Sequence, residues 1–504
     1  MKKLIFFIFI IQPFLLLAQN LQPKFSNYNI DNGLAQSVVY SVYVDANGVE
    51  WIGTNDGLNS YDGYKFDVYK PDANNPYSLT SNRIMFFALE DSKNNLWIVT
   101  LDGLLNKFNL KTKLVENYGA DLPDSLRLNT FSYRTFIEDF RTNIWIGTAS
   151  GMYKYDRKQN VLQTYFSNPS DKNSISNDSI THSLLDNKNN IWFGTANGIN
   201  KYIPEKDNFK RYEISEEIIP ANAITYLYQD QNNTIYAFTA HGIWIYDEVN
   251  DKFNFIKIPL IDQDTQILAF TDDKKGNFWL GTNNGLYMYN INTKKHTSFF
   301  NDPKNKKSIS NNTINYLYYD ELGELWIATA DGLNLYNYET NDFTAYYVGE
   351  SDGYDSFISS ITEDANHNLW LSHQRINTQG KVSLFERKTK KIHKIQYNPL
   401  SNTSFFVNQT FIFYLNFNFN IVMPYKDRFG NIWFGSFGRG VSKYSPRINN
   451  FELYKNSILD PNSIPDGGVW AIEETDDGLI WVSIYNYGIV SFNPKTQQVE
   501  QKIP

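Results

Sequence analysis

Cysteine is absent from the 504-residue chain. Its absence excludes disulfide bonds, thiolate metal sites, a cysteine nucleophile and a lipid-modified N-terminal cysteine. Basic residues are also fewer than acidic ones, 46 against 54, which gives a formal net charge of −8. A protein that binds the phosphate backbone normally carries a basic face or domain, so we expect no nucleic-acid partner.

Long apolar runs are scarce as well. Residues 4–17 are mostly apolar, follow two lysines and precede a small residue, which is the pattern of a secretory signal peptide. The run is shorter than the roughly 20 residues that a membrane-spanning helix needs, and Pro13 interrupts it. Residues 411–421 end in apolar residues alternating with Asn, which is typical of a half-buried strand. We therefore assign residues 1–19 to a signal peptide and expect an exported, periplasmic protein.

Aromatic residues, by contrast, make up 16% of the chain, a content that excludes a disordered protein. At this length we expect several domains or a repeat array rather than one compact core. One unit recurs ten times around a large aromatic anchor, with successive anchors 43 to 63 residues apart. The anchors are Trp51, Trp97, Trp145, Trp192, Tyr236, Trp279, Trp326, Trp370, Trp433 and Trp481. A period in the forties is typical of arrays of small supersecondary units.

An Asp stands six residues before the anchor in nine of the ten units, and Thr475 replaces it in the tenth. The nine are Asp45, Asp91, Asp139, Asp186, Asp230, Asp273, Asp320, Asp364 and Asp427. Asp suits a tight turn because its carboxylate accepts a hydrogen bond from the backbone N–H two residues later. Each unit is predicted to form four short strands, which in the seventh unit cover residues 312–319, 325–329, 332–338 and 343–348.

A lone four-stranded sheet of this kind cannot bury its two apolar faces. The Trp anchor is large and flat, which suits the space between neighbouring sheets. In a radial arrangement each sheet covers its neighbours, so the repeat predicts an all-β fold, the β-propeller.

Three anchor segments carry a resemblance to a known family. Residues 51–61 (WIGTNDGLNSY), 145–155 and 192–202 resemble the two-component regulator propeller repeat. The loops at 173–177 and 307–311 match the inter-blade connector of that family. The resemblance implies two seven-bladed propellers outside the inner membrane, followed by a β-sandwich, a membrane helix and a histidine kinase. It thus implies a histidine kinase module as partner, in cis if this chain is a fragment or otherwise in trans.

The turn glycines predict a domain boundary. A Gly lies six residues after the anchor in the first seven units but not in the last three. We therefore expect a seven-bladed β-propeller over residues 20–350 and an incomplete second propeller of about three blades over 351–504. An open ring would expose apolar faces at a free-energy penalty on the order of 10 kcal/mol. We therefore expect that the natural chain continues, that the gene is truncated, or that another protein covers the edge. A single ten-bladed ring is the geometric alternative.

Residues 25–30 resemble the fourth strand of a repeat but precede the first complete repeat, and we expect them to complete another blade.

Signatures of catalysis are weak. The six histidines lack the spacing of a helical zinc pair. A single carboxylate in each turn supplies too few of the oxygen ligands that a calcium ion needs. We therefore expect neither a metal nor a cofactor. Phosphate-binding glycine loops and a nucleophile elbow are absent. We expect no enzymatic activity in these residues; histidine kinase activity would lie in a C-terminal region beyond them. A propeller lyase or glycosidase is the alternative, because the separations of carboxylates cannot be read from sequence.

Departures from the repeat indicate candidate ligand contacts, because loops over the central channel commonly bind ligands in such folds. The residue before the turn Gly varies among units, and one unit combines an unusual His there with a nearby Trp on which a sugar ring would stack. The candidates are His241, Trp244, Arg83, Arg134, Arg375, Asp56, Asp102 and Asp331. An ordinary exposed loop residue is the alternative for each.

The resemblance implies a non-enzymatic periplasmic module that senses a ligand for a two-component receptor. The resemblance implies an oligosaccharide or another polysaccharide breakdown product as that ligand. A structural platform for protein interactions is a further alternative, and a homodimer is an assembly that the sequence allows.

Overall fold

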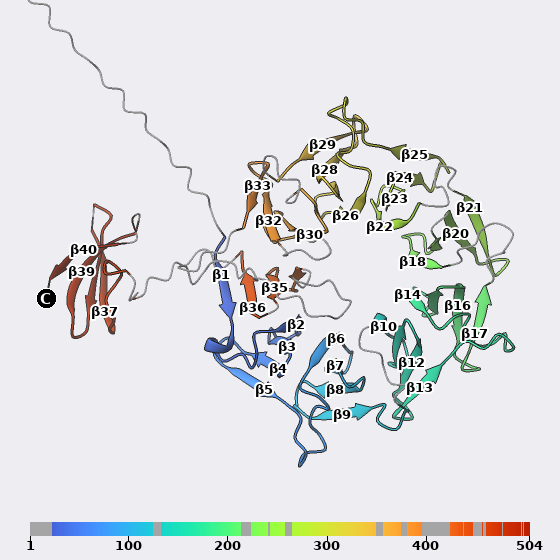
Figure 1. The fold of residues 1–504 in the computed structure, drawn as a ribbon, viewed down its shortest axis with the longest axis horizontal. Helices are drawn as coiled ribbons and strands as arrows, with labels where there is room; N and C mark the ends of the chain where they lie inside the picture. Colours follow the sequence, from blue (N-terminus) through green and yellow to red (C-terminus); the bar gives the residue numbers. More distant parts are fainter. Residues whose placement is uncertain are drawn as a thin grey trace, which may run out of the picture. The chain divides into compact units, whose positions relative to one another are not determined.

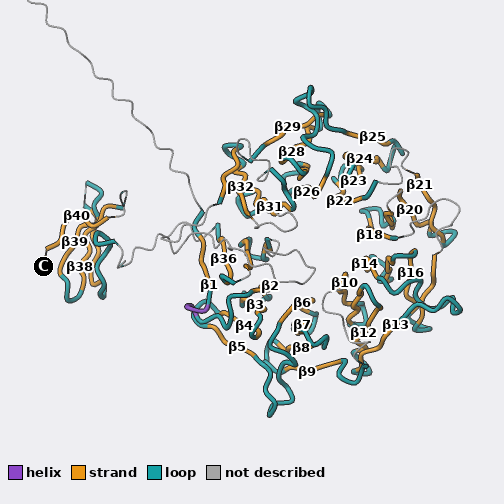
Figure 2. Tube along the Cα trace, viewed as in Figure 1, coloured by secondary structure: helices purple, strands orange, loops and turns teal. Residues whose placement is uncertain are grey.

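The computed structural model describes residues 23–123, 133–212, 223–239, 242–257, 265–348, 356–373, 381–395, 424–436, 438–446, 456, 460–475, 477–494, 496 and 498–503. The predicted signal peptide lies outside these residues. The described chain forms two compact units, one up to Tyr444 and one from Ser445. It contains ten four-stranded antiparallel sheets, nine of them in the first unit (Figure 1). Figure 2 shows that strands and loops dominate the described residues, whose one helix is the short 3-10 helix η1 (Ile30–Asn32).

The strands of the first unit have the following bounds. Sheets one to three contain β2 (Val39–Val44), β3 (Glu50–Thr54), β4 (Gly57–Tyr61) and β5 (Phe66–Tyr69); β6 (Ile84–Glu90), β7 (Asn95–Thr100), β8 (Leu105–Asn109) and β9 (Val115–Tyr118); and β10 (Tyr133–Glu138), β11 (Ile144–Thr148), β12 (Gly151–Asp156) and β13 (Val161–Tyr165). Sheets four to six contain β14 (Ile180–Leu185), β15 (Ile191–Thr195), β16 (Gly198–Ile203) and β17 (Asn208–Tyr212); β18 (Ile224–Gln229), β19 (Ile235–Thr239), β20 (Gly242–Asp247) and β21 (Lys252–Lys257); and β22 (Ile267–Asp272), β23 (Asn277–Thr282), β24 (Gly285–Asn290) and β25 (His296–Phe299). Sheets seven to nine contain β26 (Ile314–Tyr319), β27 (Leu325–Thr329), β28 (Gly332–Asn337) and β29 (Asp342–Tyr346); β30 (Ser360–Glu363), β31 (Leu369–His373), β32 (Lys381–Glu386) and β33 (Lys391–Lys394); and β34 (Tyr425–Lys426), β35 (Ile432–Ser436) and β36 (Gly440–Tyr444) with β1 (Phe25–Tyr28).

The recurring Asp binds both the turn and the aromatic anchor. In the first sheet, Oδ1 of Asp45 accepts hydrogen bonds from the backbone N–H groups of Asn47 (2.8 Å) and Val49 (3.0 Å). Its Oδ2 accepts a hydrogen bond from the indole Nε1–H of Trp51 at 3.0 Å. The same Asp-to-anchor bond, 2.7–3.2 Å long, joins Asp91 with Trp97, Asp139 with Trp145, Asp186 with Trp192, Asp230 with Tyr236, Asp273 with Trp279, Asp320 with Trp326, Asp364 with Trp370 and Asp427 with Trp433. The predicted turn role of this Asp is therefore confirmed.

In the first unit, each of the nine anchors packs against the sheet that follows it around the ring. Trp51 is fully buried and shares a core cluster with Leu96, Ile98 and Phe108 of the second sheet. The glycine two residues after the anchor permits this close approach, since a Cβ on Gly53 would lie 2.8 Å from Cγ2 of Ile84 in the next sheet. The predicted all-β propeller, built from sheets that cover one another, is confirmed.

The N-terminal strand closes the first unit. β1 pairs antiparallel with β36, from Phe25 opposite Tyr444 to Tyr28 opposite Val441, and so becomes the outer strand of the ninth sheet. The anchor of that sheet, Trp433, shares a core cluster with residues of the first sheet. The prediction that residues 25–30 complete another blade is confirmed.

The boundary between the two units differs from the one expected near residue 350. Trp326 of the seventh sheet packs with Leu371 and Phe385 of the eighth, so the stacking of sheets continues past residue 350. The division seen here lies between Tyr444 and Ser445. The shifted glycines after the seventh unit alter the turn between the second and third strands, whereas the faces that carry the inter-sheet packing stay apolar.

The second unit holds one sheet, formed by β37 (Val469–Glu474), β38 (Ile480–Ile484), β39 (Gly488–Asn493) and β40 (Gln498–Ile503). All six residues of β37 are exposed. Trp481, which has Thr475 in place of the Asp, is only half-buried. Among the described residues of the chain, no helix has the length and apolar character needed to cross a membrane.

We expect Asp273→Ala to lower the free energy of unfolding by about 2–4 kcal/mol, because the buried indole N–H of Trp279 and two backbone N–H groups would lose their acceptor. Urea denaturation followed by tryptophan fluorescence measures the change. The control is Asp247→Ala, which removes a half-buried turn carboxylate that accepts no hydrogen bond from an anchor, and it is expected to change the free energy by less than about 1 kcal/mol. Equal effects of the two substitutions would contradict the central role of the buried Asp.

Candidate ligand-binding pocket

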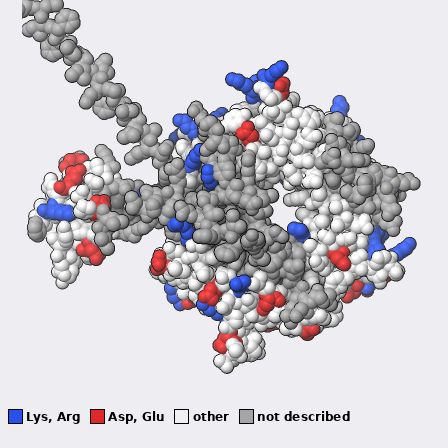
Figure 3. All heavy atoms as spheres, viewed as in Figure 1, with Lys and Arg blue, Asp and Glu red and all other residues white. Residues whose placement is uncertain are grey.

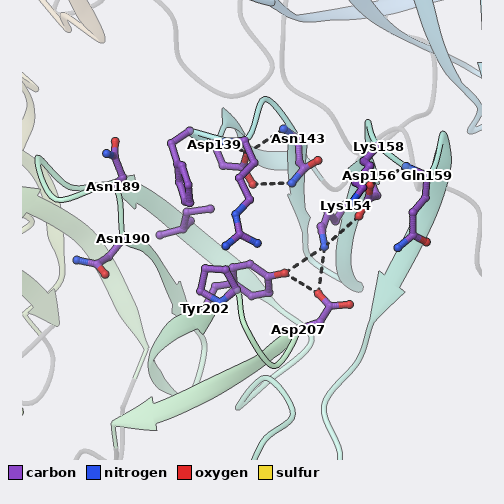
Figure 4. A pocket seen from close by; sticks show the side chains of 14 residues that line it. Asp139, Asn143, Lys154, Asp156, Lys158, Gln159, Asn189, Asn190, Tyr202 and Asp207 are labelled. Carbon is purple, nitrogen blue, oxygen red and sulfur yellow. Dashed lines mark hydrogen bonds and ion pairs between the residues drawn. The ribbon is translucent and has the colours of Figure 1, made fainter.

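A pocket of about 450 Å³ lies between the third and fourth sheets, among the turns that follow β10, β12, β14 and β16. We call it the inter-sheet pocket. Its lining residues are Asp139, Phe140, Arg141, Asn143, Lys154, Asp156, Lys158, Gln159, Asn189, Asn190, Ile191, Tyr202, Pro204 and Asp207. Figure 4 shows Asn189 and Asn190 on one side of the pocket, with Lys158 and Gln159 on the other.

The residue that follows the third strand differs from sheet to sheet, and the pocket lies where this residue is short. In the third sheet, Nη2 of Arg157 reaches back to Oδ2 of Asp91 in the second sheet at 2.7 Å. In the eighth sheet, Nη2 of Arg387 contacts Oδ2 of Asp320 in the seventh sheet in the same way, at 2.6 Å. The fourth sheet has Pro204 at the corresponding position, directly after its third strand. Because a proline ring is much shorter than an arginine side chain, the space in front of Asp139 stays open.

The rim of the pocket combines an aromatic ring with polar groups. Phe140 is 50% exposed, and the guanidinium carbon of Arg141 lies 5.1 Å from the centre of its ring. Asn189, Lys158 and Gln159 are exposed at the same pocket. Their amide and ammonium groups are hydrogen-bonding partners of the kind that hydroxyl-rich ligands require.

A hydrogen-bond network that joins the buried Lys154 and Tyr202 to the exposed Asp207 forms the floor. Nζ of Lys154, whose side chain is 5% exposed, lies 3.1 Å from both the hydroxyl of Tyr202 and Oδ1 of Asp207 (Figure 4). Tyr202 and Tyr165 also donate hydrogen bonds to Oδ1 of Asp207, at 2.6 and 2.7 Å. Burial and the bond to Asp207 raise the pKa of both tyrosines. Burial opposes ionisation of Asp207, but the bonds from Tyr202, Tyr165 and Lys154 outweigh it and lower the pKa of this carboxyl group.

The sequence-predicted ligand contacts lie elsewhere. Asp56 is half-buried in the turn between β3 and β4, where it pairs with Nζ of Lys70 at 2.7 Å. Asp102 is exposed and accepts a hydrogen bond from the hydroxyl of Thr100 at 2.6 Å, whereas Asp331 is half-buried in the β27–β28 turn.

Both described arginines of the predicted set are exposed: Arg83 lies just before β6, and Arg134 lies on β10. No hydrogen bond or ion pair of the described residues joins any two of the predicted contacts. His241 and Arg375 lie outside the described residues.

Trp244 does not present a ring for a sugar to stack on. Its side chain is only 4% exposed, lies opposite Ala237 and Phe255 on the neighbouring strands, and belongs to the core cluster that contains Trp192. The small Ala237 leaves room for the indole, so Trp244 fills the space between sheets. This burial argues against the expected ligand-stacking role.

Three side chains in the seventh and eighth sheets offer potential metal ligands. Ligand atoms of Glu321, Glu363 and His367 lie within 4.8 Å of one another. Oε1 of Glu363 is 2.6 Å from Nδ1 of His367, and Nζ of Lys426 is 3.0 Å from Oε1 of Glu321. The ammonium group already provides the cluster with a positive charge.

Sequence comparison connects the fold to a known repeat. The model of the two component regulator propeller matches residues 33–56 and 308–331. This chain carries two-component regulator propeller repeats. The resemblance predicted from the sequence is therefore confirmed.

Individual relatives match parts of the chain. A segment of 64 residues, 13% of this chain and 4% of the relative, is 42% identical to histidine kinase P4 of Formosa agariphila. Two solved extracellular domains from B. thetaiotaomicron, both assigned to hybrid two-component systems, are similar over 95% of this chain. One is 22% identical with a TM-score of 0.38, and the other is 18% identical with a TM-score of 0.39. The chain spans 67% and 60% of these two structures, and a small fraction of the kinase.

The lowered pKa of Asp207 predicts a pH-dependent contribution to stability. A carboxyl group whose pKa is lower in the folded state stabilises the fold above its unfolded value, about 3.9, and this contribution is lost as the pH falls through the folded value. Asp207→Asn should therefore be less stable than the wild type at pH 7, and the difference should shrink below about pH 4. Urea denaturation across this range measures it. Asp171→Asn on an exposed connector is the control, and a difference for Asp207→Asn that is independent of pH would refute the assignment.

Proposed function

We propose that this chain is a periplasmic ligand-sensing module of a two-component receptor and that the inter-sheet pocket binds an oligosaccharide. The observation that carries the proposal is Pro204, which opens a polar pocket where the third and eighth sheets place an arginine. Its volume of about 450 Å³ falls in the usual range of ligand sites, roughly 300–1,000 Å³. The exposed ring of Phe140 beside several amides offers an apolar face and hydrogen bonds together, which suits a sugar ring.

The carboxylates of the pocket favour binding over bond cleavage. A glycosidase needs a carboxylic acid with a raised pKa to protonate the leaving group. The pKa of Asp207 is lowered instead, and Asp139 is occupied by hydrogen bonds from Asn143 and Trp145. We therefore propose a non-enzymatic role.

The signalling role rests on the repeat and on sequence similarity to a kinase. The matching repeat model is that of two-component regulators, and a segment of the chain is 42% identical to a histidine kinase. These matches support a histidine kinase module as the partner, in cis or in trans. Binding of the oligosaccharide would bias the packing of the sheets and so alter the state of the kinase.

Pro204→Arg tests the pocket directly. The new guanidinium is expected to reach the carboxylate of Asp139, as Arg157 reaches Asp91, and to fill the pocket. Isothermal titration calorimetry against a panel of plant and algal oligosaccharides should show at least a tenfold loss of affinity for the ligand that the wild type binds. Thermal unfolding should show a fold at least as stable as the wild type, because the substitution adds a buried ion pair of the kind already present in two sheets.

The matched control is Glu248→Arg, which places an arginine at the corresponding exposed position of the fifth sheet. Its affinity should equal that of the wild type. Failure of the wild type to bind any member of the panel would overturn the oligosaccharide proposal. Unchanged binding by Pro204→Arg would place the ligand site elsewhere.

A further inference from the structure

A second pocket, of about 400 Å³, lies at the outer edge of the fourth sheet. We call it the basic pocket. Its lining residues are Lys172, Asn173, Ile203, Lys206, Asn208, Phe209, Lys210 and Arg211. Four of these eight are cationic and none is acidic, although the chain as a whole carries a net charge of −8. Figure 3 shows Lys and Arg side chains at this edge, over β16 and β17.

Most of this positive charge has no acidic partner. Lys210 pairs with Asp251 of the fifth sheet. Lys172 and Lys206 are exposed, and neither forms an ion pair with a described residue. Arg211 is half-buried, and its guanidinium donates to the backbone carbonyls of Ser174 (2.7 Å) and of Asn168 and Ile175. Neutral carbonyl groups hold the guanidinium in place and leave its charge uncompensated.

The repeat does not require these cations. The fourth and seventh sheets share the same connector, and in both the buried Phe of the outer strand donates its backbone N–H to the connector at 2.9 Å. The positions of Lys206, Lys210 and Arg211 hold Thr340, Thr344 and Ala345 in the seventh sheet. The same three positions are occupied by Thr112, Glu116 and Asn117 in the second sheet. Because three sheets form the same edge with different residues at these positions, Lys206, Lys210 and Arg211 are specific to the fourth sheet, whereas the position of Lys172 also holds a lysine, Lys306, in the seventh sheet.

The two pockets share one turn. Residues 204–207 connect β16 to β17, and within this turn Pro204 and Asp207 line the inter-sheet pocket while Lys206 lines the basic pocket. A chain of sugar units bound at the first pocket therefore needs to cross only this turn to reach the second.

We propose that the basic pocket is a subsite for the anionic groups, carboxylate or sulfate, of an acidic oligosaccharide whose neutral part occupies the inter-sheet pocket. This inference rests on the proposed function and names the class of its ligand. Lys172 and Lys206 supply mobile charges, and Arg211 supplies a fixed guanidinium that suits planar carboxylate or sulfate oxygens.

The experiment uses the double variant Lys172→Ala/Lys206→Ala, which spares the structural Arg211. Calorimetry compares oligogalacturonate, a chondroitin sulfate oligosaccharide and a neutral cello-oligosaccharide of similar length, each at low and at physiological salt. The double variant should bind the acidic ligand about tenfold more weakly, since each exposed charge pair contributes a severalfold effect at most, and it should lose most of the salt dependence. Carboxylate and sulfate ligands are separate arms, so the preferred anion is identified.

The matched control is Lys306→Ala/Lys307→Ala on the corresponding connector of the seventh sheet, which should leave binding unchanged. An equal loss in both double variants would show attraction to surface charge in general and would overturn the subsite. The subsite would be overturned, and the proposed function left intact, by a second outcome. In that outcome neutral ligands bind as tightly as acidic ones, and their binding is lost in Pro204→Arg but not in the lysine double variant. Absence of binding by every saccharide would overturn both.

Discussion

One buried carboxylate per sheet holds this fold together. Its first oxygen accepts the backbone N–H groups of the turn, and its second accepts the indole N–H of the anchor, as in Asp45 and Trp51. The turn, the orientation of the Trp and the inter-sheet packing are therefore coupled through one side chain. Hydrogen bonds to a charged acceptor are stronger than hydrogen bonds between neutral groups. Loss of the carboxylate would leave buried N–H groups without partners. The tenth sheet has Thr475 instead, and its Trp481 is only half-buried.

The candidate site is a consequence of the same carboxylate. Arg157 and Arg387 each donate a hydrogen bond to the recurring Asp of the preceding sheet, and their side chains fill the groove between the two sheets. Where Pro204 replaces the arginine, the groove becomes a pocket with Asp139 at its back. A ligand in this pocket would touch the group that sets the packing of two neighbouring sheets. Under the proposed function, binding would therefore be coupled to the packing of the sheets without a hinge.

The repeat made the fold predictable, whereas the site was not. Period, Asp and Trp together allowed the four-stranded sheets, the turn role of Asp45 and the strand at residues 25–30 to be predicted. The bond from Asp to indole was missed, because it joins residues six apart whose side chains meet only after the hairpin forms. Trp244 was predicted as a ligand contact because sequence shows an aromatic near a turn but not the small Ala237 opposite it. Pro204 could not be predicted as a site residue, because its position varies among the sheets and gains significance only from the contact that Arg157 makes in the folded chain.

Net charge would have pointed away from an acidic ligand, yet it is a poor guide at the scale of one site. At physiological ionic strength charges are screened beyond about 8 Å, so a bound ligand is governed by the few groups around it. At the basic pocket these are Lys172, Lys206 and Arg211, with no acidic residue in the lining. The acidic residues elsewhere on the chain then act chiefly on the approach of the ligand. An acidic saccharide would associate slowly at low salt and still be held firmly once docked, so its rate of association should rise with salt while its affinity falls.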